Sequence, residues 1–79
     1  MVDDAALMAE ATRLACRLAA GPTLSYAAIK RAIHSAATNT LDQQLDLERD
    51  SQRALNATAD FKEGVAAFLA KRPAQFTGR

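Results

Sequence analysis

The amino-acid sequence predicts an all-α fold: a small orthogonal or antiparallel bundle of three to four helices. Alanine, leucine and arginine are the commonest of the 79 residues, and runs of β-branched residues are absent, which favours helix over strand. Nineteen of the apolar residues are alanine, so few large side chains are available for a core. We therefore expect residues 1–79 to form one helical domain with a thin core that needs a partner surface.

The first expected helix begins at Asp3 or Asp4, either of which can cap it, and runs to about Ala20. Its apolar positions follow the spacing of one buried stripe, made of Leu7, Ala11, Leu14 and Leu18. Gly21 and Pro22 end this helix, because glycine can adopt a left-handed C-terminal cap and proline cannot continue a helix.

The second expected helix begins at Thr23 or Ser25 and runs through Ala37. Its apolar side chains at helical spacing are Tyr26, Ile29 and Ile33. Residues 38–40 break the pattern. Both this break and the preceding one at residues 21–22 are short enough to bring neighbouring helices back antiparallel.

Two capping boxes mark the remaining helices. Residues 40–43 have the T-x-x-Q form, and the helix that follows should reach about Asn56 with a mostly charged, solvated surface. Residues 60–63 have the D-x-x-E form and predict the start of a fourth helix that Pro73 closes. Residues 74–79 are expected to form an irregular tail.

Composition excludes several classes of protein. One cysteine and one histidine can form neither an internal disulfide nor a standard zinc site, so we expect no metal. Ten basic and nine acidic residues are too balanced for a nucleic-acid binder by charge alone. No apolar run approaches a membrane span, and the acidic N-terminus does not resemble a signal peptide. We therefore expect a cytoplasmic protein with neither a nucleic-acid nor a membrane partner.

The sequence offers no catalytic constellation. Nucleophilic catalysis needs a nucleophile and a base within hydrogen-bond reach, and only Cys16 and His34 qualify, on different expected helices. Their ordinary interpretation is an apolar filler and a helix-surface residue. The three glycines are not clustered, so no glycine-rich phosphate loop is present. We expect no catalytic residue.

The end of the fourth helix carries the one candidate binding site. Phe68, Lys71 and Arg72 stand at i, i+3 and i+4, so an aromatic ring and two cations share one side of a helix. Such a group suits a ligand with a phosphate and a planar ring. The alternative is that the cations offset the helix dipole while the apolar residues form core: Phe61, Val65, Phe68 and Leu69. The spacing leaves both interpretations open.

Residues 60–73, D-F-K-E-G-V-A-A-F-L-A-K-R-P, are followed by Phe76. This segment resembles the D-x-x-E-G-x-x-A-F-x-x-K-R-x-x-x-F ending of the enoyl-CoA hydratase/isomerase (crotonase) superfamily. Upstream positions that are similar to the family's C-terminal helices, in register, are Gly21, Pro22, Thr23, Tyr26, Lys30, Leu41, Leu45 and Glu48. Residues 21–33 and 40–55 resemble bacterial enoyl-CoA hydratases and phenylacetate-pathway isomerases.

This resemblance implies that the chain is the C-terminal helical segment of a longer enzyme acting on acyl-CoA thioesters. The family's oxyanion-binding amides and acid–base carboxylates lie outside this segment, so the isolated chain should be inactive. By this resemblance, Phe68 and Lys71 match family residues that border the adenine and phosphate end of coenzyme A. Arg72 would assist or replace Lys71. Coenzyme A is part of the substrate, and no separate cofactor is implied.

The resemblance also implies homo-oligomer contacts, in trimers or hexamers, through the apolar stripes of the first and third helices. The alternative is a stand-alone helical homo-oligomerisation module with no ligand. The amphipathic spacing and the thin core are consistent with both interpretations. The A-F-x-x-K-R segment favours the enzyme segment, because a plain oligomerisation module has no need of it.

Overall fold

The computed structural model describes all 79 residues and contains helices but no strand. The elements in order are the 3₁₀ turn η1 (Asp4–Ala6), α1 (Leu7–Ala19), α2 (Thr23–Ala36), α3 (Leu41–Asn56) and α4 (Ala59–Ala70). The predicted all-α fold is confirmed. None of these helices combines the length and the apolar character that crossing a membrane requires.

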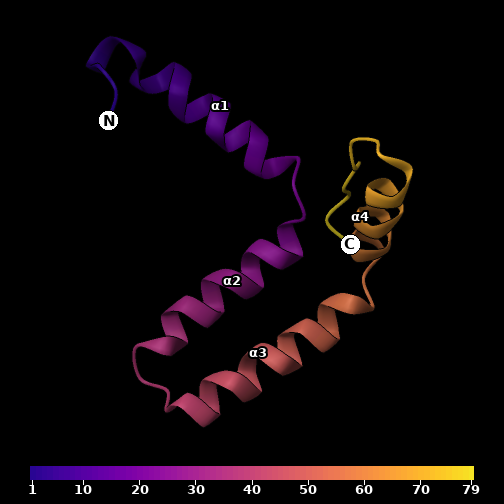
Figure 1. Cartoon of the computed structure of the whole chain (residues 1–79). Helices are drawn as coiled ribbons and strands as arrows, with labels where there is room; N and C mark the ends of the chain where they lie inside the picture. The colour runs from indigo at the N-terminus through magenta and orange to yellow at the C-terminus, as the bar shows by residue number, and fades with distance from the viewer.

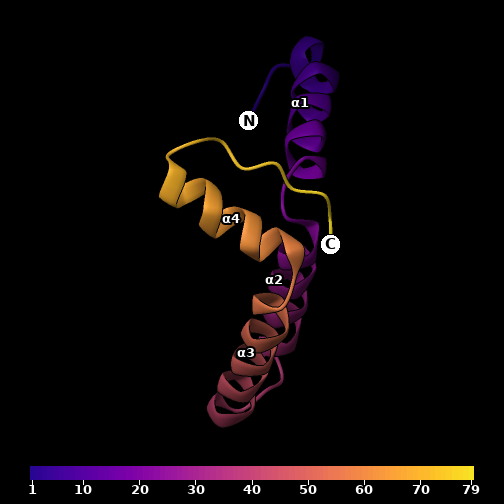
Figure 2. The ribbon, with the colours of Figure 1, turned by 90° about the vertical axis from the view of Figure 1, so that its right-hand side faces the viewer.

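The packed part of the molecule is formed by α2, α3 and α4. The helices α2 and α3 lie side by side as an antiparallel hairpin, as the break at residues 38–40 predicts (Figure 1). The helix α4 crosses the end of α3, and α1 extends away from α2 instead of returning beside it (Figure 2). The antiparallel return predicted at residues 21–22 is therefore wrong. The Cα radius of gyration is 15.9 Å, against about 12 Å for a compact chain of this length.

Very few side chains are buried. Only Ala28, Asp60 and Ala67 are shielded from solvent. The predicted buried stripe on α1 is wrong, because no other α-helix packs along the length of that helix. Its three leucines, Leu7, Leu14 and Leu18, are each about half exposed. The helical spacing correctly locates an apolar side, but the chain itself does not cover it.

The start of α3 is capped as predicted. Thr40 Oγ1 accepts a hydrogen bond from the Gln43 amide at 3.2 Å, and Gln43 Oε1 accepts one from the Thr40 amide at 2.9 Å. The cap predicted at Asp3 or Asp4 is wrong, since neither side chain caps a helix there. The chain enters α1 through the 3₁₀ turn, whose own backbone hydrogen bonds replace a side-chain cap.

The cap of α4 also differs from the prediction. Thr58, not Asp60, occupies the N-cap, where its Oγ1 accepts a hydrogen bond from the Phe61 amide at 3.1 Å. The helix thus begins at Ala59, and Asp60 lies inside its first turn. The D-x-x-E pattern finds the helix start but assigns the capping role to the wrong side chain, which leaves the Asp60 carboxylate free for another task.

The end of α1 shows why glycine stands at position 21. The predicted left-handed cap is wrong, because Gly21 does not have a positive φ and Ala20 ends the helix in the right-handed region. Instead, the Tyr26 ring lies against Gly21, and a Cβ on Gly21 would lie 2.7 Å from two ring carbons. A larger residue at position 21 would therefore force the Tyr26 ring to move.

Candidate functional site

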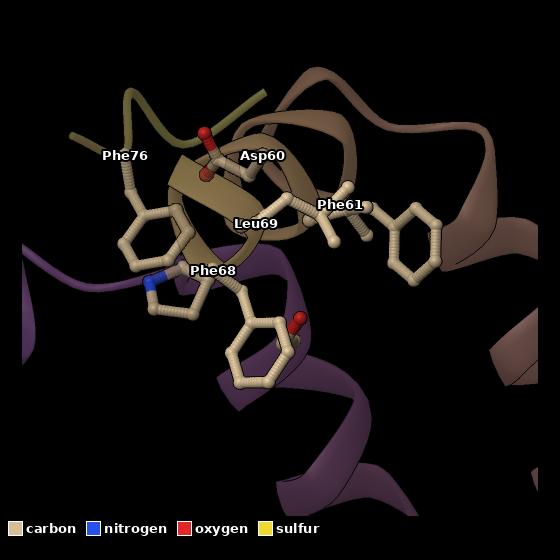
Figure 3. A pocket seen from close by; sticks show the side chains of 9 residues that line it. Asp60, Phe61, Phe68, Leu69 and Phe76 are labelled. Atoms are coloured by element: carbon tan, nitrogen blue, oxygen red, sulfur yellow. The ribbon is translucent and has the colours of Figure 1, made fainter. Parts of the chain in front are cut away.

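A groove of about 350 Å³ lies where α4, the start of α2 and the C-terminal segment meet (Figure 3). Its wall is mostly apolar and includes Pro22, Phe61, Val65, Phe68, Leu69 and Phe76. Three of these residues are aromatic. The groove therefore offers an apolar surface suited to a flat ring.

The apolar side of α4 is a surface and not a core. Phe68 is 82% exposed and Leu69 is 74% exposed. Phe61 and Val65 are each more than 40% exposed. The interpretation of these four residues as core is therefore wrong for this chain, since the buried residues of α4 are Asp60 and Ala67.

The C-terminal segment forms one side of the groove. Residues 73–79 form neither helix nor strand and run back across α4 (Figure 2). They are anchored by Asp60, which accepts hydrogen bonds from the amides of Thr77 at 2.8 Å and Gly78 at 2.9 Å. The segment brings the Phe76 ring onto Gly64, where a Cβ would lie 3.6 Å from the ring.

The helix α4 ends in a left-handed turn at Lys71. The Lys71 amide donates to the carbonyl of Phe68 at 3.2 Å, and the Arg72 amide donates to the carbonyl of Ala67 at 3.0 Å. This is the Schellman pattern, which normally places glycine at the left-handed position. Here Lys71 occupies it with φ 54° and ψ 44°. The helix thus ends at Ala70, three residues before the proline expected to close it.

The two cations after α4 have different surroundings. Arg72 pairs with Glu63 through two hydrogen bonds, of 2.7 Å from Nη1 and 3.0 Å from Nη2. The Gln75 amide donates to the same carboxylate at 2.8 Å. The Arg72 hydrogen bonds and then the Gln75 amide lower the pKa of Glu63 to about 2. Lys71 is exposed and belongs to no ion pair.

The structure brings together only part of the predicted site. Phe68 lines the groove, whereas Lys71 and Arg72 follow at the end of α4 and are not part of the groove wall. Sequence reasoning missed the anchoring role of Asp60 and the position of Phe76 against α4. Both residues are part of the motif at residues 60–76. The motif alone, however, does not predict that the C-terminal segment folds back against α4.

Other reactive side chains do not converge. Cys16 is exposed on α1, and His34 is exposed on α2. No group of three or more histidine, cysteine or acidic side chains is placed to hold a metal ion. The mostly charged, solvated surface predicted for α3 carries ion pairs, since Arg49 pairs with Asp46 and Asp50 at 3.0 Å each. The carboxylates of that helix therefore form a solvated surface.

The fold and the sequence together identify the class of protein. All 79 residues match the model of the enoyl-CoA hydratase/isomerase family. The chain belongs to this family, which confirms the resemblance drawn from the motif at residues 60–76.

Individual relatives agree with this assignment. The chain is 58% identical, over its full length, to 1,2-epoxyphenylacetyl-CoA isomerase from Escherichia coli K12, of which it covers 30%. It matches a crystal structure of an enoyl-CoA hydratase subunit from Geobacillus kaustophilus HTA426 with a TM-score of 0.92 and 42% identity. A crystal structure from Mycobacterium abscessus, described as an enoyl-CoA hydratase/isomerase, matches with a TM-score of 0.95 and 36% identity.

These matches also account for the open shape. Each solved structure covers 99% of this chain, yet the chain spans only 30% of each of them. The same helix arrangement therefore occurs as one part of much longer proteins. Arrangements of this kind leave apolar sides that other parts of a longer protein can cover.

Proposed function

We propose that this chain supplies one edge of the coenzyme A site, and subunit contacts, in an enzyme acting on acyl-CoA thioesters. It has no catalytic residues of its own in this proposal. One observation carries this proposal. The exposed ring of Phe68 lines the groove, and Lys71, three residues later, has an ammonium group that belongs to no ion pair. A cytoplasmic location belongs to the same proposal.

The chemistry of coenzyme A suits this edge. Its adenine is a flat ring that an exposed aromatic side chain such as Phe68 can support. Its phosphates are anions that a free ammonium group such as that of Lys71 can bind. Arg72 is proposed to assist Lys71 only indirectly, because Glu63 already occupies its guanidinium group.

Isothermal titration of the full chain with coenzyme A tests the binding role. We expect Lys71→Gln and Phe68→Ala each to weaken binding roughly tenfold, since each removes an interaction of about 1.5 kcal/mol. Lys62→Gln is the matched control, because it removes one exposed lysine from α4, the helix that Lys71 follows. Equal losses in Lys71→Gln and Lys62→Gln would show only a general charge effect and would contradict the proposal.

Sedimentation velocity tests the subunit contacts, proposed as those of a trimer or hexamer. Large apolar side chains stand exposed on α1 and α3: Leu7, Leu14, Leu18, Leu41 and Leu45. We expect Leu14→Glu to dissociate the oligomer and Thr12→Glu, on another side of α1, to leave it intact. A wild-type chain that sediments as a monomer would contradict this part of the proposal.

An activity assay tests the expected lack of catalysis. We expect the chain by itself to hydrate crotonyl-CoA no faster than buffer, because the proposal places the acid–base carboxylates and the oxyanion-binding amides outside residues 1–79. Measurable turnover that follows the purified chain would contradict the proposal.

A further inference from the structure

Lys71 holds a backbone conformation that residues with a side chain rarely adopt. Its φ of 54° and ψ of 44° lie in the left-handed region. This conformation costs free energy for any residue with a Cβ and persists only where the surrounding structure fixes it. Contacts on both sides of Lys71 must therefore hold the turn.

On the helix side, the turn is fixed by backbone hydrogen bonds to the last residues of α4. On the other side, it is fixed by Glu63. The Glu63 carboxylate receives both Arg72 hydrogen bonds and the Gln75 amide, so three donors that follow Lys71 converge on it. Its side chain is only 24% exposed, less than any other acidic partner in the ion pairs of this chain.

The same contacts leave the positive charges of Arg72 and Lys71 in different surroundings. Arg72 is neutralised by Glu63, whereas the neighbouring Lys71 keeps an unpaired ammonium group. We propose that Glu63 is a positioning residue for the coenzyme A edge: it fixes the turn and withdraws Arg72, so that Lys71 alone meets a ligand phosphate. This inference rests on the function proposed above for the site.

Coenzyme A affinity distinguishes positioning from a general charge effect. Glu63→Gln removes a negative charge while keeping the shape of the side chain. If the charge only repelled an anionic ligand, this variant would bind coenzyme A more tightly. If Glu63 positions Lys71, we expect binding about five- to tenfold weaker, the equivalent of one charge-assisted hydrogen bond. Glu63→Asp keeps the charge but shortens its reach, and we expect it to weaken binding as well.

A double-mutant cycle with Arg72→Gln tests whether Glu63 acts through Arg72. We expect the double variant to bind no more weakly than either single variant, because all three break the same pair. Direct phosphate binding by Arg72 instead predicts that Arg72→Gln weakens binding equally in both backgrounds. Glu10→Gln is the matched control, because it breaks the 2.8 Å pair with Arg13 on α1, away from the groove.

Nuclear magnetic resonance supplies the structural readout. The Lys71 Cα shift and amide–Hα coupling report its positive φ, which we expect to be lost in Glu63→Gln and kept in Glu10→Gln. A wild-type chain that fails to bind coenzyme A overturns the proposed function and this inference with it. Wild-type binding that Glu63→Gln leaves unchanged overturns this inference alone. Weaker binding with the Lys71 turn intact overturns it too.

Discussion

The carboxylate of Asp60 and the backbone amide of Thr77 are joined by a 2.8 Å hydrogen bond across 17 residues of sequence. Asp60 is the only buried charged residue, at 4% exposed. Its own amide donates to the Arg79 carbonyl at 2.8 Å, so its backbone and its carboxylate both hold the C-terminal segment. Burial of this carboxylate is tolerated because hydrogen bonds replace its contacts with water.

Asp60→Asn is predicted to loosen the C-terminal segment. The asparagine amide would place a donor opposite the Thr77 or Gly78 amide, and a hydrogen bond to a charged acceptor is worth about 1.5–3 kcal/mol. We expect hydrogen exchange at the Thr77 and Gly78 amides to accelerate roughly 10- to 100-fold. Asp42→Asn, at an exposed carboxylate on α3, serves as the control. Unchanged exchange in Asp60→Asn would show that the anchor lies elsewhere.

The Glu63 contact is predicted to survive mild acid. Its pKa is lowered to about 2, mainly by hydrogen bonds from Arg72, against an ordinary value of 4.5. A carboxylate with a lowered pKa stabilises the folded state above its unfolded pKa and loses this contribution as pH falls through its folded pKa. The contact should thus be complete above pH 4.5 and lost near pH 2. The Gln75 amide shift, followed against pH, should show a midpoint near 2; a midpoint near 4.5 would contradict the pairing.

Two glycines are predicted to respond in opposite ways to the same substitution. Gly64→Ala places a Cβ at 3.6 Å from Phe76, an ordinary contact, and replaces a helical glycine. We expect it to stabilise the chain by about 0.5–1 kcal/mol. Gly21→Ala would force the Tyr26 ring to move, and we expect destabilisation by roughly 1 kcal/mol or more. Thermal melts followed by circular dichroism compare them; shifts in the same direction would contradict the packing of Phe76 on Gly64 and of Tyr26 on Gly21.

The sequence predicts the helices well because their start signals are local. The capping box at residues 40–43 and the break before it act within one turn, so α3 begins where the sequence predicts. The burial of a side chain is harder to predict from the sequence, because it depends on which other part of the chain lies opposite each helix face. Leu14 has core spacing and remains exposed because no second surface of the chain reaches α1.

In the candidate site, too, the sequence predicts local relations better than contacts between distant residues. An i, i+3 relation places Phe68 and Lys71 near the end of one helix, and the family motif names both. The pairing of Arg72 with Glu63 spans nine residues and depends on a left-handed turn at a lysine. The sequence does not predict that turn, because glycine is the residue that usually occupies the left-handed position and a lysine stands there instead. Adjacent cations that look equivalent in the sequence are therefore separated only by the fold.

The left-handed turn itself gives the sharpest stability test. Lys71→Gly should relieve a backbone conformation that costs a residue with a Cβ roughly 1–2 kcal/mol, so we expect the melting temperature to rise by a few degrees. Lys62→Gly is the matched control, because it places glycine inside α4 and should lower stability by about 1 kcal/mol. Circular dichroism melts of both variants at one protein concentration make the comparison. If both variants melt below the wild type, Lys71 does not bear the strain assigned to it, and glycine acts at both positions only by loosening the unfolded chain.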